Sequence, residues 1–342
     1  MQANRPGPAH PFLQGRTGSV DADSAALILS PVNWPTPRIR TRPTGSWPGS
    51  RLPVETPLML SATGADQEKR SPPMTTKTAI VTGAASGIGA KFARTVRDRL
   101  RLTVADIQAE RLEELFGKES ADLLPLKLDV TNVEDWKRAL DATLAKYGRL
   151  DYLFNIAGVS LPRFILDAEP LHVDRHIDVN TKGVLYGTTL AAKIMQRQGS
   201  GHIVNISSLA GIAPVAGLSY YTASKFAVRG FSLAAAQELR PKGIHVTVIC
   251  PDLVKTAMYD HQLTVPEESA ITFSGPKKVL SVEDVASALV EAMEKKPLEI
   301  TIPPSRGLLA KLGCAVPSLA MVLAPRLKKK GLRRIEEIKR SL

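Results

Sequence analysis

TGAASGIG, residues 82–89, decides the fold, because three glycines lie where a short apolar run, TAIVT, gives way to the helical pattern GIGAKFARTVRDRL. A glycine inside a helix costs about 1 kcal/mol against alanine, so glycines at a helix start need a reason. Glycine lets the backbone turn tightly and approach a pyrophosphate, and the helix start offers free N–H groups. An ordinary tight turn is the plainer alternative. We expect the phosphate-binding residues to be Gly83, Ser86, Gly87, Ile88 and Gly89.

An acidic residue follows this loop at the distance that a dinucleotide site requires. Asp106 ends the run LTVAD, 23 positions after the first glycine. Its carboxylate can accept both ribose hydroxyls of an adenosine and would repel a 2′-phosphate, and Ser86 and Ile107 supply no cation to bind one. This favours NAD over NADP. Helix capping is the alternative role for Asp106, and Arg99 and Arg101 are the nearby cations that could reverse the preference.

Short β-branched runs alternate with longer helical patterns from residue 77 to residue 304. The expected strands are TAIVT, LTVAD, LPLKLDV, LDYLFNIAG, HIVNISS, HVTVICP and LEITIPP. Each of the first six is followed by a helical pattern, the fourth of which is the long stretch VDRHIDVNTKGVLYGTTLAAKIMQRQ. Such alternation is typical of βαβ units with right-handed connections. It predicts a Rossmann-type doubly wound parallel sheet of about seven strands, with helices on both faces and ligands beyond the carboxyl ends of the strands.

Composition divides the chain into three parts. Residues 1–73 contain 12 of the 25 prolines and no sustained apolar period, which predicts a disordered N-terminal extension. Two alternatives stay open for this part: a functional protein that begins at Met74, and an organelle transit peptide, against which its five acidic residues argue. Residues 74–304 are the expected nucleotide-binding catalytic domain. Residues 305–342 are an extension that is first apolar and then basic.

Charge and cysteine content exclude several classes of protein. The net charge of +12 comes mostly from residues 305–342, and no aromatic residue follows Phe273 for bases to stack on, so no nucleic-acid partner is expected. Two cysteines, Cys250 and Cys314, exclude a disulfide framework and a cysteine-rich zinc site. The six histidines show no metal-binding spacing, so no metal site is expected. A reducing, cytoplasmic location fits this composition.

A tyrosine and a lysine share one helical face. Only Tyr221, of the six tyrosines, has a lysine four residues later, which is Lys225. A free tyrosine loses its proton at about pH 10, and a neighbouring ammonium favours the phenolate, so the pair suits a general base. Ser208 follows the run HIVNIS, where its hydroxyl can reach a substrate oxygen, and Asn180 lies within a helical pattern. Each feature also has a structural alternative when taken alone. Tyr221 and Lys225 could be a pair on an exposed helix surface, Ser208 could be a turn or helix-cap residue, and Asn180 could be a hydrogen-bonded structural amide.

Together these motifs resemble the short-chain dehydrogenase/reductase family over residues 76–303. The resemblance implies that Tyr221 is the acid/base on the substrate oxygen and that Ser208 orients this oxygen. It also implies that Lys225 binds the nicotinamide ribose and lowers the tyrosine pKa, and that Asn180 holds a water that relays the proton. The family's further cofactor contacts map onto Asp129 and Val130 at the adenine, Asn155, Ala157 and Gly158 after the fourth strand, and Pro251, Val254 and Thr256 after the sixth.

Two positions depart from the family pattern. Ile156 stands where an asparagine is common, which puts a sheet-stabilising contact in doubt, and Asp252 stands where a glycine is common. Neither change is expected to abolish activity. Related proteins associate through their long helices, so the resemblance also implies a homodimer or homotetramer.

The loop LAGIAPVAGLS after Ser208 is almost wholly apolar, and residues 257–278 are expected to cover the pocket. This lining favours an apolar alcohol or ketone as substrate, although these residues could simply pack. The uncharged run 312–325 is too short to span a membrane. It could lie on an anionic membrane surface with the basic end that follows, or the extension could close over the pocket or a subunit interface.

The sequence therefore predicts an NAD-dependent oxidoreductase that acts on a hydroxyl or carbonyl of an apolar small molecule, such as a steroid, retinoid, fatty or other secondary alcohol. A non-catalytic dinucleotide-binding sensor or scaffold with the same fold is the alternative.

Overall fold

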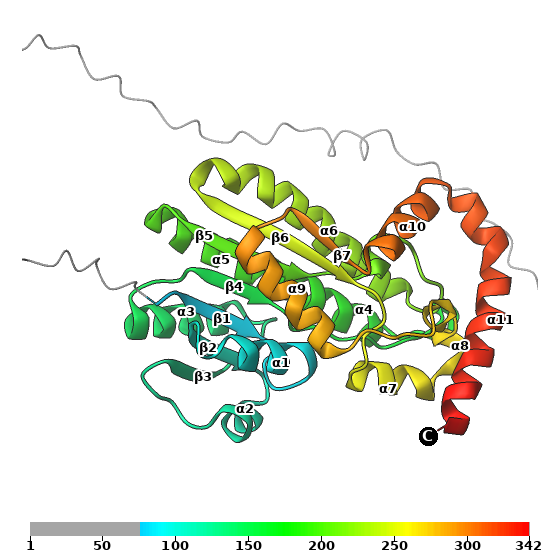
Figure 1. Ribbon diagram of the computed structural model, residues 1–342, viewed down its shortest axis with the longest axis horizontal. Helices are drawn as coiled ribbons and strands as arrows, with labels where there is room; N and C mark the ends of the chain where they lie inside the picture. Colours follow the sequence, from blue (N-terminus) through cyan, green and yellow to red (C-terminus); the bar gives the residue numbers. More distant parts are fainter. Residues whose placement is uncertain (1–75, 342) are drawn as a thin grey trace, which may run out of the picture. The chain divides into compact units, whose positions relative to one another are not determined.

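The computed structural model describes residues 76–341, and the expected N-terminal extension, residues 1–73, lies outside them. Seven parallel strands form one sheet in the order β3-β2-β1-β4-β5-β6-β7 (Figure 1). The strands are β1 (Thr78–Thr82), β2 (Arg101–Asp106), β3 (Leu123–Lys127), β4 (Tyr152–Asn155), β5 (Gly201–Ile206), β6 (Ile244–Pro251) and β7 (Glu299–Ile302). The order reverses between β1 and β4, which is where open α/β sheets bind ligands.

Helices cover both faces of this sheet and confirm the predicted doubly wound fold (Figure 1). One apolar core lies between the sheet and the helices α1, α2 and α9, and the other lies between the sheet and α3, α5 and α6. Neighbouring residues of β1 alternate between the two cores, with Val81 in the first and Ile80 in the second. The helices are α1 (Gly87–Val96), α2 (Ala109–Phe116), α3 (Val133–Tyr147), α5 (Gly183–Gln198), α6 (Ser219–Leu239) and α9 (Val282–Lys295).

The expected long helix before β5 is divided into three segments. A short helix, α4 (Pro170–Arg175), leads into the π-helical turn η3 (His176–Lys182), and α5 follows without a break. Single π-helical turns are rare and often occur at functional sites. Asn180 lies in this turn, so the wider winding aims its side chain differently from an ordinary helical residue.

Residues after β6 and β7 add further helices at one end of this unit (Figure 1). Two short helices, α7 (Ala257–Thr264) and α8 (Pro266–Ser269), follow β6, and the C-terminal extension forms α10 (Pro304–Ala315) and α11 (Pro317–Ser341). Ile335 of α11 is buried in a cluster with Tyr259, Leu263 and Phe273, which anchors α11 on the segment after β6. No helix in the described part of the chain is long and apolar enough to cross a membrane.

A buried polar network joins β4, β5 and the helices behind them. Asn155 Nδ2 donates to Asn205 Oδ1 at 2.8 Å and to Thr188 Oγ1 at 3.3 Å, and Asn205 Nδ2 donates to Ser232 Oγ at 2.9 Å. Asn155 and Asn205 are both buried. Because an unpaired buried amide is costly, this network fixes the register of β4 against β5 close to the carboxyl ends.

Replacement of Asn205 by alanine should lower the free energy of unfolding by about 1–3 kcal/mol, because it removes partners from the buried Asn155 amide and the Ser232 hydroxyl. Urea denaturation measures this change. Gln196→Ala, at an exposed position of α5, is the control and should stay within about 0.5 kcal/mol of the parent. An Asn205 variant as stable as the parent would show that the network contributes nothing.

Candidate active site

The glycine loop has positions that do not accommodate a side chain. Gly83 and Gly87 have φ values of +68° and +51°, in the left-handed region that favours glycine. A Cβ on Gly83 would lie 2.9 Å from the Ala157 backbone, and a Cβ on Gly89 would lie 2.1 Å from the Gly83 carbonyl oxygen. Ser86 precedes α1 without a side-chain cap, so the first N–H groups of the helix are free for a ligand. This loop fits the phosphates of a dinucleotide.

Asp106 ties the end of β2 to this loop. Its Oδ2 accepts a hydrogen bond from Ala85 N at 3.0 Å, and its Oδ1 accepts one from Gln108 N at 3.1 Å. The N-cap residue of α2 is Gln108 rather than Asp106. The two arginines that could have reversed the nucleotide preference form other ion pairs: Arg99 with Glu294 at 2.8 Å and Arg101 with Asp122 at 3.2 Å.

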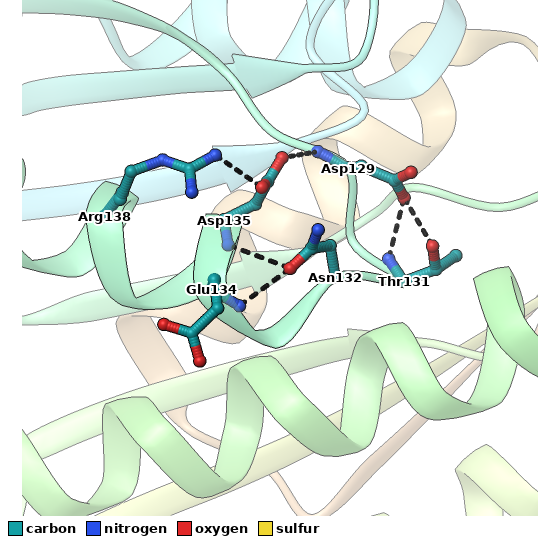
Figure 2. Close-up of polar contacts among 6 residues, drawn as sticks. All are labelled: Asp129, Thr131, Asn132, Glu134, Asp135 and Arg138. Atoms are coloured by element: carbon teal, nitrogen blue, oxygen red, sulfur yellow. Dashed lines mark hydrogen bonds and ion pairs between the residues drawn. The ribbon is translucent and has the colours of Figure 1, made fainter.

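The loop after β3 is held by its own acidic side chains (Figure 2). Asp129 accepts hydrogen bonds on Oδ1 from Thr131 N at 2.9 Å and from Thr131 Oγ1 at 2.7 Å. Asp135 Oδ2 accepts from Asp129 N at 3.1 Å, and Asn132 caps α3 by accepting from Glu134 N. These bonds fix the loop so that Asp129 and Val130 line the same cavity as the glycine loop.

One cavity of about 1230 Å³ brings together most of the expected site residues. Ser208, Tyr221 and Lys225 line it at the carboxyl ends of β4, β5 and β6. Asn180 and Asn155 are buried behind the lining. The expected cofactor contacts that line the cavity are Gly83, Ser86, Gly87, Ile88, Gly89, Asp106, Asp129, Val130, Ala157, Gly158, Pro251, Val254 and Thr256.

Lys225 lies one helical turn after Tyr221, and its Nζ is 5.7 Å from the centre of the tyrosine ring. This Nζ donates to the Ile206 carbonyl oxygen at 3.0 Å. Burial raises the pKa of Tyr221 to about 12, while the facing Ser208 hydroxyl acts to lower this pKa. Burial lowers the pKa of Lys225 to about 8. Both shifts favour the uncharged forms, so in the protein alone burial outweighs the expected lowering of the tyrosine pKa by Lys225.

The Asn180 side chain forms hydrogen bonds with other residues of the protein. Its Oδ1 accepts from Val159 N at 2.8 Å, and its Nδ2 donates to Val159 O at 2.9 Å and to Ser224 Oγ at 3.1 Å. Asn180 therefore joins the loop after β4 to the helix that carries Tyr221. Because Oδ1 and Nδ2 of Asn180 both have protein partners, a water that relays the proton at this residue would have to bind its main-chain atoms.

The contact that an asparagine at position 156 was expected to provide is replaced by hydrogen bonds to Thr82. Thr82, the last residue of β1, accepts hydrogen bonds on Oγ1 from Ile156 N at 3.0 Å and from Ala157 N at 3.2 Å. Its hydroxyl thereby joins β1 to the backbone after β4 without a contribution from the residue 156 side chain. Ile156 packs against the apolar core instead.

Asp252 has a partner that the sequence does not reveal. Its Oδ2 accepts from Nε of Arg306, in α10, at 2.9 Å, and both side chains line the cavity. Arg334 of α11 donates from Nη1 to the Gly275 carbonyl oxygen at 3.1 Å. The residue that replaces the common glycine thus holds the C-terminal extension against the site.

The extension itself forms part of the cavity wall, which the sequence left open. Apolar residues of α10 and α11 line it, and the segment after β6 contributes as expected from residues 257–278. No spacing in the sequence indicates which of these residues face inward. The lining residues of the extension are Arg306, Leu309, Ala310, Leu312, Gly313, Ala315, Val316, Ala320, Leu323 and Leu327.

The sequence pattern of the short chain dehydrogenases matches residues 77–265, more than half of the chain. The chain belongs to the short-chain dehydrogenase family. It is 38% identical over 193 residues to a 3-alpha-(or 20-beta)-hydroxysteroid dehydrogenase of Mycobacterium tuberculosis, which covers 56% of this chain and 73% of the relative. It is 36% identical over 231 residues to (+)-borneol dehydrogenase 2 of Salvia officinalis, with coverage of 63% and 81%.

Solved structures of this family share the fold and hold either nucleotide. A short chain dehydrogenase/reductase from Burkholderia phymatum in complex with NAD superposes with a TM-score of 0.63 at 27% identity, covering 71% of this chain and 95% of that one. ElxO with NADP bound gives a TM-score of 0.59 at 27% identity, with coverage of 66% and 97%. The short-chain dehydrogenase described here is thus an oxidoreductase of a family that binds NAD or NADP.

Replacement of Asp252 by asparagine should loosen α10, because the hydrogen bond that Arg306 donates loses its charged acceptor. Such bonds contribute about 1.5–3 kcal/mol, so amide exchange within residues 304–315 should rise about tenfold while exchange in β1 to β6 stays unchanged. Hydrogen–deuterium exchange measures both regions. Glu283→Gln, which neutralises one side of the exposed Lys91 pair, is the control. Unchanged exchange in α10 would show that the pair does not hold the extension.

Proposed function

We propose that this short-chain dehydrogenase is an NAD-dependent enzyme that transfers hydride between the nicotinamide and a hydroxyl or carbonyl group of an apolar small molecule. The observation that carries the proposal is the placement of the Tyr221 side chain. It faces Ser208, has Lys225 one turn away, and lines the same cavity as the glycine loop. A bound nicotinamide supplies the hydride acceptor or donor; the side chains supply the proton transfer and the positioning.

Each of four residues has a distinct part in this proposal. Tyr221 takes the proton from a substrate hydroxyl, or gives one to a carbonyl oxygen, and Ser208 orients that oxygen. Lys225 holds the nicotinamide ribose and favours the phenolate once its ammonium has partners. Asn180 positions the loop at Val159 and the Tyr221 helix through Ser224, as its hydrogen bonds support. The presence of all four in one site argues against a non-catalytic sensor or scaffold.

Tyr221→Phe should lower kcat for alcohol oxidation by two or more orders of magnitude, the usual scale of general acid–base catalysis. Because the tyrosine must lose its proton, oxidation by the parent enzyme should also rise with pH toward the raised pKa of Tyr221, and the variant should lose this rise. Steady-state rates followed at the absorbance of the reduced nicotinamide measure both effects.

Nucleotide binding by Tyr221→Phe, measured by calorimetry, is the control and should survive, since the phosphates contact the glycine loop. Full activity in this variant would remove Tyr221 from the mechanism.

The preference for NAD rests on the carboxylate of Asp106. It lines the cavity beside the glycine loop, and the arginines at 99 and 101 are paired elsewhere. A 2′-phosphate near this carboxylate would be repelled, whereas two ribose hydroxyls could donate to it.

Asp106→Asn should reduce the ratio of kcat/KM for NAD to that for NADP at least tenfold, because it removes the negative charge and keeps an oxygen for Ala85 N. The two rates, measured at limiting nucleotide, give the ratio. Asp141→Asn removes the same charge at an exposed position of α3 and should leave the ratio unchanged. A parent enzyme that already prefers NADP would contradict the assignment.

Several features support an apolar substrate. The cavity that Tyr221 lines is also lined by Ala213, Val215, Leu218, Leu253 and apolar residues of the extension. The relatives named above are a hydroxysteroid and a borneol dehydrogenase. We therefore infer a secondary alcohol or ketone of low polarity, such as a steroid, retinoid or fatty alcohol. The proposal also includes a homodimer or homotetramer. It further includes a reducing cytoplasmic location, which suits the two free cysteines.

A further inference from the structure

The C-terminal extension exposes large apolar side chains that no other described residue covers. Met321 and Val322 are 75% and 69% exposed on α11, and Leu308 is 62% exposed on α10. Leu309, Leu312 and Val316 are exposed and also line the cavity, which places them at its mouth. Exposed apolar groups gathered on two consecutive helices are typical of an interaction surface.

Positive charge accompanies these apolar groups. Residues 300–335 contain eight lysines and arginines and no acidic residue. Some of these cations are engaged in the fold, such as Arg306 with Asp252 and Lys328 with Glu267. Four others form no ion pair within the described residues, and we call them the basic stripe: Arg326, Lys329, Lys330 and Arg333.

Helical spacing puts the basic stripe on the outer face of α11. The stripe residues Arg326, Lys329, Lys330 and Arg333 lie four, seven, eight and eleven residues after Val322, so they share one side of the helix with Val322. The opposite side carries the buried Gly331 and Ile335. The outer face is therefore apolar at its start and basic further along.

We propose that the outer face of α11, with the exposed apolar residues of α10, docks on a bilayer surface rich in anionic phospholipid. The basic stripe would pair with the headgroups, and Met321, Val322 and Leu308 would enter the boundary with the acyl chains. Charge complementarity selects this occupant. A second copy of the chain, placed face to face across a two-fold axis, would set the basic stripe against itself.

Docking in this orientation would put the cavity mouth at the bilayer. Leu309, Leu312 and Val316 border this mouth on the α10 side, next to the exposed Leu308. Ala320, Leu323 and Leu327 line the cavity from the face of α11 that is turned away from the bilayer. An apolar substrate dissolved in the bilayer would then reach Tyr221 without crossing water. This step rests on the proposed function; the docking itself does not.

Co-sedimentation of the full-length protein with phosphatidylcholine vesicles, with and without phosphatidylglycerol, tests the docking in the absence of nucleotide and substrate. The parent should bind vesicles that contain phosphatidylglycerol and should be released by high salt. The triple variant R326Q/K329Q/R333Q should bind about 100-fold more weakly, because each basic residue near an anionic surface contributes about a fivefold increase in binding. The variant Met321→Ser/Val322→Ser should also weaken binding at low salt, because it removes the apolar groups that enter the boundary with the acyl chains.

The matched control is K118Q/R197Q/K242Q, which removes three exposed basic side chains from the rest of the described chain and should bind as the parent does. Equal recovery of parent and stripe variant would overturn the proposal. So would a change of oligomeric state in the stripe variant by analytical ultracentrifugation, which would assign this face to a second copy. Because no turnover is measured, these outcomes are independent of the proposed reaction.

Discussion

Two ionisable side chains buried side by side, Tyr221 and Lys225, impose the constraint on which the site depends. Burial raises the pKa of the phenol to about 12 and lowers that of the ammonium to about 8, so each shift acts against the charged form. The Lys225 Nζ has one backbone acceptor, the Ile206 carbonyl, which leaves part of its hydrogen-bonding capacity unused. In the proposed reaction, further partners for this ammonium or a further positive charge beside the ring would favour the phenolate.

The elements around this pair serve to keep it in place. Asn180 connects the loop after β4 to the helix that carries Tyr221, and the π-helical winding of η3 aims it there. Thr82 and Asn205 hold the carboxyl ends of β1, β4 and β5 together. These groups are polar and buried, so each loses hydrogen bonds if its neighbour moves. The geometry of the site is thus maintained by the same bonds that fix the register of the sheet.

Much of this arrangement could be predicted from the sequence, because it depends on local patterns. Alternating strand and helix periods predicted the sheet, and the spacing of Tyr221 and Lys225 predicted their shared face. Features that depend on pairs far apart in the sequence could not be predicted. Asp252 and Arg306 are separated by 54 residues, and nothing in either segment indicates that they meet. The division of the long helix at η3 was missed for a different reason, since its apolar spacing is that of an ordinary helix.

The departure at Asp252 and the presence of an extension are best understood together. A glycine at this position could not accept the hydrogen bond from Arg306, and α10 would lose its charged contact with the strand end beside the cavity. With the aspartate in place, α10 and α11 become the outer wall of the cavity. One face of α11 then lines the cavity, and the opposite face presents Arg326, Lys329 and Arg333 to solvent. The Asp252–Arg306 pair at α10 and the Ile335 cluster at α11 thus hold both faces of the extension in place together.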